Sequence, residues 1–113
     1  MEEKNCVFCK IIARQIPSDI IAETDDIIVI KDIRPKTSIH YLIIPKKHIP
    51  DIQSLQTYDA SIAGNIIMMA QKLSSQLSNS QAFRLVSNNG SDVGQIVFHI
   101  HFHFLAGNKM ADF

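Results

Sequence analysis

The sequence predicts an α+β fold: a mostly antiparallel sheet of about five strands, one long helix and a short N-terminal helix. Short runs rich in Ile and Val, separated by polar turn residues, indicate strands, and one longer segment has apolar residues at helical spacing. Connections between successive strands are short, which favours antiparallel pairing because a parallel pair needs a long crossover. A chain of 113 residues with 46% hydrophobic residues is expected to form a single domain over residues 1–113.

The first half of the chain is expected to contain the short helix and three strands. Residues 6–14 have apolar side chains at helical spacing, and Pro17 favours an end of the helix before it. Three apolar runs then predict strands at Ile20–Glu23, Ile27–Lys31 and Tyr41–Ile44. The polar residues 24–26 predict a hairpin turn between the first two of these strands.

The long helix is expected at residues 59–77. Its apolar side chains recur three and four positions apart at Ile62, Ile66, Met69, Leu73 and Leu77. Ile67, Met68 and Ala70 widen this stripe. The wide stripe has two interpretations: a broad face buried in the core, or a second face that packs against a partner chain.

The last two strands are expected at residues 82–86 and 95–105, with a polar loop between them. The second segment contains three of the 5 histidines, His99, His101 and His103, alternating with apolar residues. A period of two is typical of a half-buried strand, so we expect three imidazoles on one face and the intervening side chains, Phe98 among them, in the core. A solvated face without a chemical role is the simple alternative.

The charge balance and the N-terminus narrow the class of function. The chain has 11 Lys and Arg residues against 11 Asp and Glu, whereas a protein that grips a nucleic-acid backbone needs a surplus of positive charge. The first residues lack the apolar segment of a secretory signal, and no run approaches the roughly 18 apolar residues of a membrane helix. We therefore expect a cytoplasmic protein that binds a small molecule, with neither nucleic acid nor membrane as a partner.

Alternating histidines suit phosphate chemistry. A neutral imidazole is a nucleophile near pH 7, and its neighbours can bind phosphate oxygens or pass a proton to a leaving group. One metal ion cannot bind all three, because at roughly 3.3 Å per residue the backbones of His99 and His103 lie about 13 Å apart. The polar loop adds donors for anionic oxygens: the side chains of Asn88 and Gln95 and the backbone of Asn89, Gly90 and Gly94. Phosphoryl or nucleotidyl transfer is therefore predicted.

The chain resembles the histidine triad (HIT) superfamily and looks like its Hint branch, the purine nucleoside phosphoramidases. Residues 99–105 match the family pattern of histidines that alternate with apolar residues. Further blocks stand in the family's order and spacing at residues 8–12, 16–17, 32–33, 40–48 and 88–92. The resemblance covers nearly the whole chain and implies a HIT-like fold that assembles as a homodimer.

The resemblance implies a hydrolase that cleaves purine nucleoside phosphoramidates or related adenylyl conjugates at the α-phosphate. His101 would attack phosphorus and form a nucleotidyl-histidine intermediate, which water then hydrolyses. His99 and His103 would bind phosphate oxygens or relay the proton of the leaving group, with His40 behind them in the same network. Asp32 would accept hydrogen bonds from the ribose hydroxyls.

The resemblance also implies which residues line the nucleotide site. The base pocket would be formed by the apolar side chains of Val7, Phe8, Ile11, Ile30 and Ile33. The phosphate would lie beside Asn88, Gly94, Gln95 and Ile96. The Hint branch usually has Ser where this chain has Ile96, so a hydroxyl donor is missing and we expect reduced efficiency on phosphoramidates.

Cys6 and Cys9 form a C-x-x-C pair, which in a reducing compartment indicates metal ligands or a redox couple. The resemblance implies that His48 and His99 complete a tetrahedral zinc site, as in some bacterial members, and that the zinc is structural. Two small buried residues of the first helix are the alternative. No organic cofactor is expected.

Two other functions are compatible with the same residues. A dinucleoside polyphosphate hydrolase, as in the fragile histidine triad branch, would use the same histidines. A nucleotide- or zinc-dependent interaction module with little turnover would keep the pocket without useful catalysis.

Overall fold

The structure is a computed structural model that describes residues 5–112. Its sheet has the strand order β1-β2-β3-β5-β4, and every neighbouring pair is antiparallel. The strands are β1 (Ile20–Glu23), β2 (Ile27–Lys31), β3 (Ile39–Pro45), β4 (Phe83–Val86) and β5 (Phe102–Ala106). The helices are α1 (Val7–Ile12) and α2 (Ala60–Ser75), with short 3-10 turns at Ile52–Ser54, Thr57–Asp59 and Ser91–Val93. The predicted α+β class, the sheet and the long helix are confirmed.

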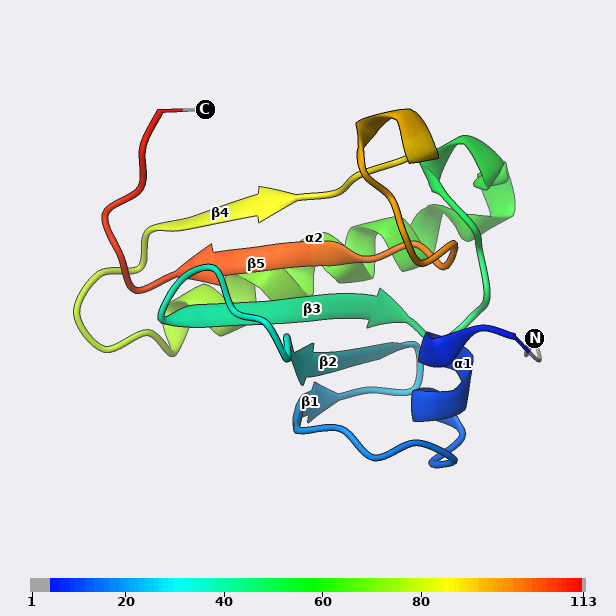
Figure 1. The fold of residues 1–113 in the computed structure, drawn as a ribbon, viewed down its shortest axis with the longest axis horizontal. Coiled ribbons are helices and arrows are strands. Elements are labelled where there is room, and N and C mark those ends of the chain that lie inside the picture. Colours follow the sequence, from blue (N-terminus) through cyan, green and yellow to red (C-terminus); the bar gives the residue numbers. More distant parts are fainter. Residues whose placement is uncertain (1–4, 113) are drawn as a thin grey trace.

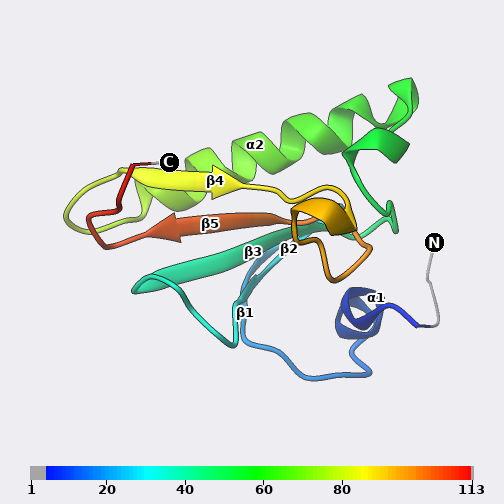
Figure 2. The same ribbon diagram turned by 45° about the horizontal axis from the view of Figure 1, so that its top comes forward.

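The two helices lie on opposite sides of the sheet (Figure 1, Figure 2). β2 is buried on both faces: Ile27 and Val29 pack in the core with α2, whereas Ile28 and Ile30 pack in the core with α1. This two-sided burial explains why β2 is a continuous apolar run rather than an alternating one. α2 extends along the sheet, but α1 has only 6 residues and covers one end of it (Figure 2).

α2 has a buried side and an exposed apolar side. Ile66, Met69 and Leu73 are buried in the core that α2 forms with the sheet, whereas Ile67 and Met68 are 54% and 61% exposed. A partner chain on the exposed side stays a prediction. Within residues 5–112, neither helix combines the length and the apolar character needed to cross a membrane.

The last strand is shorter than the sequence predicts. β5 comprises Phe102–Ala106, so the expectation of a strand that begins at Gln95 is wrong. Pairing with β4 ends where Val86 meets His103. The backbone N–H of Ile100 donates instead to the carbonyl of Ile49, at 2.7 Å. Residues 95–101 therefore form an irregular segment that leads into the sheet (Figure 1).

The expected alternation of burial also fails in this irregular segment. His99 is fully buried, whereas Phe98 is 48% exposed. The alternation is kept only inside β5, where Phe104 is fully buried between the sheet and α2. A period of two fixes the face of a side chain only where the backbone is extended and paired.

Leu73→Ala tests the packing of α2 on the sheet. Leu73 is 4% exposed, and truncation of a buried leucine lowers the free energy of unfolding by about 2–5 kcal/mol because a cavity remains. The matched control is Gln71→Ala on the exposed side of the same helix, with an expected change below about 0.5 kcal/mol. Urea denaturation followed by circular dichroism measures both, and equal losses would contradict this packing.

Candidate functional site

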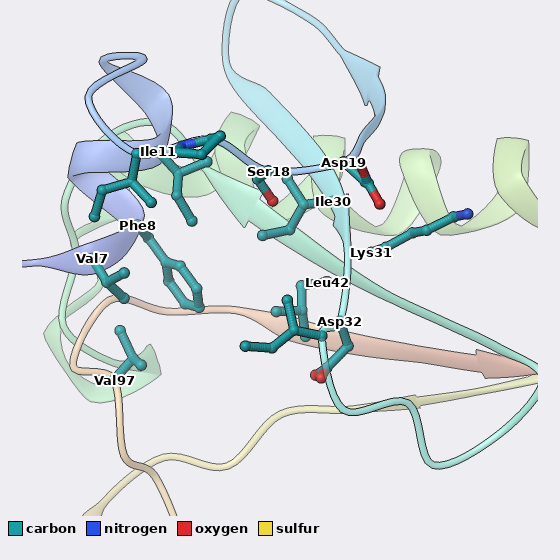
Figure 3. A pocket seen from close by; sticks show the side chains of 13 residues that line it. Val7, Phe8, Ile11, Ser18, Asp19, Ile30, Lys31, Asp32, Leu42 and Val97 are labelled. Atoms are coloured by element: carbon teal, nitrogen blue, oxygen red, sulfur yellow. The ribbon is translucent and has the colours of Figure 1, made fainter.

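An open pocket of about 790 Å³ lies between α1 and β2 (Figure 3). The side chains predicted for the base pocket all line it: Val7, Phe8, Ile11, Ile30 and Ile33. Four further apolar residues line the pocket and are not predicted from the sequence: Ile16, Pro17, Leu42 and Val97. Leu42 lies two positions after His40 and so shares its face of β3, which is a signal that the sequence carries. Val97 lies in the irregular segment, where no pattern points to it.

His101 stands beside this pocket, and one hydrogen bond decides which of its ring nitrogens is free. Its ring meets the ring of Phe8 edge-on, with 5.0 Å between centroids. Nδ1 lies 2.8 Å from the backbone carbonyl of His99, and a carbonyl oxygen can only accept, so Nδ1 carries the proton. Nε2 therefore keeps the lone pair that a nucleophile needs.

The imidazoles of His40 and His103 form a hydrogen-bonded chain whose direction is set by a backbone group. The N–H of Lys36 donates to Nδ1 of His40 at 3.0 Å, so the proton of neutral His40 is on Nε2. This Nε2 donates to Nδ1 of His103 at 2.9 Å, which leaves the proton of His103 on its own Nε2. The rings of His103 and His101 are neighbours, with 5.3 Å between centroids.

Burial keeps these imidazoles neutral. It lowers the pKa of His103 to about 4 and holds the pKa of His101 and of His40 below the usual value, because a charged imidazole would lose its hydration. Asp32 opposes this effect and raises all three pKa values. Since burial is the larger cause, the neutral tautomers prevail at pH 7.

Asp32 follows β2 directly and is held by its neighbours. Its Oδ1 accepts the N–H of Arg34 at 2.8 Å, and its Oδ2 lies 3.4 Å from Nε2 of His40. Its backbone N–H donates to the carbonyl of His40 at 3.0 Å. The carboxylate lies at the edge of the pocket (Figure 3), where its remaining lone pairs can accept hydrogen bonds from a ligand.

The polar loop is braced from inside by Gln95, which is 4% exposed. Its Oε1 accepts the N–H of Gly90 at 2.8 Å, and its Nε2 donates to the carbonyls of Pro50 at 2.7 Å and Val97 at 3.1 Å. The N–H of Gly94 donates to Ser91 in the same loop, at 3.1 Å. These groups serve internal hydrogen bonds, so this geometry does not support their expected role as donors to an anion.

Unlike the side chain of Gln95, those of Asn88 and Ile96 make no hydrogen bonds among the described residues that hold the loop in place. The side chain of Asn88 is half-buried and has no hydrogen-bond partner within residues 5–112, so it is free to bind a ligand. Ile96 is 87% exposed and adjoins Val97 of the pocket wall. It adds apolar surface beside the site where the resemblance would place a hydroxyl.

Cysteine and histidine side chains form a second cluster between α1 and the irregular segment. Sγ of Cys6 and Cys9 and the ring nitrogens of His48 and His99 all lie within 4.8 Å of one another. Three of the separations are Cys6 Sγ to His99 Nδ1 at 3.3 Å, Cys9 Sγ to His48 Nδ1 at 3.3 Å, and His48 Nδ1 to His99 Nδ1 at 3.1 Å. Zinc bonds of ~2.3 Å to sulfur and ~2.0–2.1 Å to nitrogen give tetrahedral edges of roughly 3.3–3.8 Å. The cluster therefore has close to the size and the donor set of a zinc site.

The ring of His99 belongs to this cluster. Its Nε2 lies 2.7 Å from the carbonyl of Pro45, which can only accept, so Nε2 carries the proton and Nδ1 directs its lone pair at the cysteines. Burial lowers the pKa of His99 to about 4, which keeps the ring neutral. With both nitrogens engaged, the geometry does not support the expected role of this ring in proton relay. His99 reaches His101 through its backbone carbonyl.

The fold is that of a known class of proteins. The family described as "Scavenger mRNA decapping enzyme C-term binding" matches residues 5–113. An uncharacterized HIT-like protein of Synechocystis sp. is 39% identical over 108 residues, 96% of this chain and 95% of that protein. A HIT family hydrolase from Legionella pneumophila has a TM-score of 0.88 and 43% identity, over 95% of this chain and 96% of that one. The chain belongs to the histidine triad (HIT) family.

A metal-containing relative is also similar to this chain. A zinc-bound histidine triad family protein from Mycobacterium smegmatis has a TM-score of 0.77 and 29% identity. The match covers 89% of this chain and 73% of that one.

The hydrogen bonds require opposite tautomers in two neighbouring rings. At pH 7, His101 should be protonated on Nδ1, because its partner is a carbonyl, and His103 on Nε2, because its Nδ1 accepts from His40. Long-range ¹H–¹⁵N NMR of the imidazoles reports the protonation of each nitrogen. In the control His40→Ala, the tautomer of His103 should change while that of His101 stays. The same tautomer in both rings of the parent protein would contradict the chain of hydrogen bonds.

Proposed function

We propose that this chain hydrolyses purine nucleotide conjugates at the α-phosphate, with purine nucleoside phosphoramidates or related adenylyl conjugates as the substrate class. The observation that carries the proposal is the pair of neutral imidazoles beside an apolar pocket. His101 offers a lone pair and His103 offers an N–H. The similarity to the HIT family hydrolase from Legionella pneumophila supports the class of reaction.

The pocket accommodates the nucleoside. Its volume of about 790 Å³ falls in the usual range for small-molecule sites. The base lies among apolar side chains of α1 and β2, such as Phe8, Ile11 and Ile30. Asp32 accepts the ribose hydroxyls, since an ionised carboxylate offers acceptors only. This placement brings the α-phosphate to His101.

Two displacements at phosphorus complete the reaction. Nε2 of His101 attacks phosphorus, forming an N–P bond as the bond from phosphorus to the leaving group breaks. The N–H of His103 donates to the oxygen or leaving atom where negative charge develops, and the departing amine takes its proton from water. The ring of His101 gains positive charge, which the carbonyl of His99 stabilises through Nδ1–H. Water then displaces His101, releasing the nucleoside monophosphate and a proton.

The Cys–His cluster is proposed to hold a structural zinc ion. Two thiolates and two neutral imidazoles are a donor set that zinc favours, and the proton on Nε2 of His99 leaves the correct nitrogen free for the metal. Bound zinc would tie α1 to the irregular segment before β5. The zinc-bound relative from Mycobacterium smegmatis supports this assignment.

A homodimer is proposed through the exposed side of α2. Ile67 and Met68 present apolar surface there. A second copy of the chain would cover both side chains.

His101→Ala tests the nucleophile. The variant should lose turnover of an adenosine phosphoramidate by at least about a thousandfold, because no atom remains that can form the N–P bond. Its affinity for AMP should persist, since the pocket wall is unchanged, and calorimetry provides this control. Hydrolysis at the parental rate would show that the mechanism is wrong.

A dinucleoside polyphosphate hydrolase is the second candidate, favoured by Ile96. A phosphate leaving group departs without a proton, so it depends less on the hydroxyl that is missing here. Comparing kcat/KM on an adenosine phosphoramidate and on a diadenosine polyphosphate discriminates between the two. If no nucleotidyl-protein forms with a good leaving group, an interaction module is the better description.

Protein purified without chelator should contain about one zinc ion per chain. Cys9→Ser should lower this content, because it replaces a soft thiolate ligand by a hydroxyl. Lys10→Ala is the matched control, one position along the same helix and outside the cluster. Elemental analysis by mass spectrometry measures the content. A stoichiometry far below one despite zinc supplementation would contradict the assignment.

A further inference from the structure

The segment that carries the nucleophile lies outside the regular sheet. β5 begins at Phe102, so the positions of His99 and His101 depend on individual contacts. The N–H of Ile100 donates to the carbonyl of Ile49 at 2.7 Å, and Oγ of Ser87 donates to the carbonyl of His101 at 3.0 Å. The His99 ring also contacts the Cys–His cluster and Pro45, and the rings of His99 and His101 both meet the ring of Phe8 edge-on.

His99 connects the cluster directly to the nucleophile. Its Nδ1 lies 3.3 Å from Sγ of Cys6 and 3.6 Å from Sγ of Cys9. Its carbonyl accepts the Nδ1–H of His101 at 2.8 Å. The residue is fully buried, so a ring held at one end leaves little freedom to the carbonyl at the other.

We propose that the metal held by Cys6, Cys9, His48 and His99 positions the nucleophile. By fixing the ring of His99, the metal fixes the carbonyl that keeps the proton of His101 on Nδ1 and the lone pair on Nε2. The cysteines and His48 are then positioning residues for the reaction. This inference rests on the proposed function and assigns to the metal an effect on the chemical step, beyond a purely structural one.

Loss of the metal has a specific physical consequence. Without its metal bond, the His99 ring keeps its hydrogen bonds and its packing against Phe8, but it loses the bond that fixes its orientation. The carbonyl that it positions can then shift. His101 then also populates the tautomer with a proton on Nε2, which has no lone pair to attack phosphorus. Phe8 and Ile11 stay packed against Ile28 and Ile30 of the sheet, so the pocket for the base persists. The rate of the chemical step should therefore fall while nucleotide affinity is kept.

The experiment compares zinc-loaded protein, protein stripped with a chelator, and stripped protein reloaded with zinc. The measurements are the tautomer of His101 by long-range ¹H–¹⁵N NMR, the Kd of AMP by calorimetry, and the single-turnover rate with an adenosine phosphoramidate. Stripping should populate the Nε2-protonated tautomer and slow formation of the nucleotidyl-histidine by about tenfold or more. The Kd should stay within about twofold, and zinc should restore the tautomer and the rate.

Cys9→Ser provides the same comparison without chelator. Cys9 belongs to α1, and its thiol contacts His48 and His99. The variant should show the altered tautomer and the slower rate, whereas Lys10→Ala should show neither. Added zinc should shift Cys9→Ser toward the parent protein only at concentrations that fill the weakened site.

Three results would overturn the proposal. The first is an unchanged tautomer and rate after zinc is removed. The second is global unfolding or loss of AMP binding on stripping, which would make the metal a requirement of the whole fold. The third is failure of the parent protein to bind zinc. A different result tests the proposed function: if zinc-loaded protein forms no nucleotidyl-histidine, the hydrolase function is wrong. In that case the His101 tautomers of the zinc-loaded and stripped proteins still show whether the metal positions His101.

Discussion

The two-sided burial of β2 is the constraint on which the rest of the structure depends. Ile27 and Val29 require α2 on one face, and Ile28 and Ile30 require α1 on the other. Because α1 has only 6 residues, it covers the second face at one end alone. The pocket opens beside this short helix, so the apolar residues that stabilise the fold on this face also form the wall of the site.

Backbone groups determine the chemistry of the histidines. The carbonyl of His99 keeps the proton of His101 on Nδ1, and the carbonyl of Pro45 keeps that of His99 on Nε2. The N–H of Lys36 donates to His40, which in turn donates to His103. Three identical side chains in one short segment therefore differ in state. His101 has a free lone pair on Nε2, His103 has an N–H to donate, and His99 directs Nδ1 at the cysteines. Burial reinforces these states by keeping every ring neutral.

The sequence was sufficient for features that depend on side-chain pattern. The Ile-rich runs located β2 and β3, the spacing from Ile66 to Leu73 located α2, and the resemblance placed Phe8 and Ile30 in the pocket. The beginning of β5 could not be located, because an alternating pattern persists where the backbone leaves the sheet. The burial of His99 follows from cysteines 90 and 93 positions away in the chain. The hydrogen bonds of His99 to the carbonyl of Pro45 and of the Lys36 N–H to His40 could not be predicted either, because backbone groups leave no trace in the pattern of side chains.

The buried amide of Gln95 has a consequence for how this chain can vary. Its Oε1 accepts from Gly90 and its Nε2 donates to Val97, both close to it in the chain, and Nε2 also donates to Pro50, which lies 45 positions away. Glutamate lacks the donors and asparagine is shorter by one methylene, so neither can make all three bonds. The exposed side chains of Ser91, Asp92 and Val93 make none of these bonds, so they can be substituted while the shape of the loop is retained. Gly90 and Gly94 cannot, because their φ angles of 119° and 98° disfavour other residues. Gln95 therefore holds the shape of the loop through its three hydrogen bonds, and substitutions at the exposed loop positions leave those bonds intact.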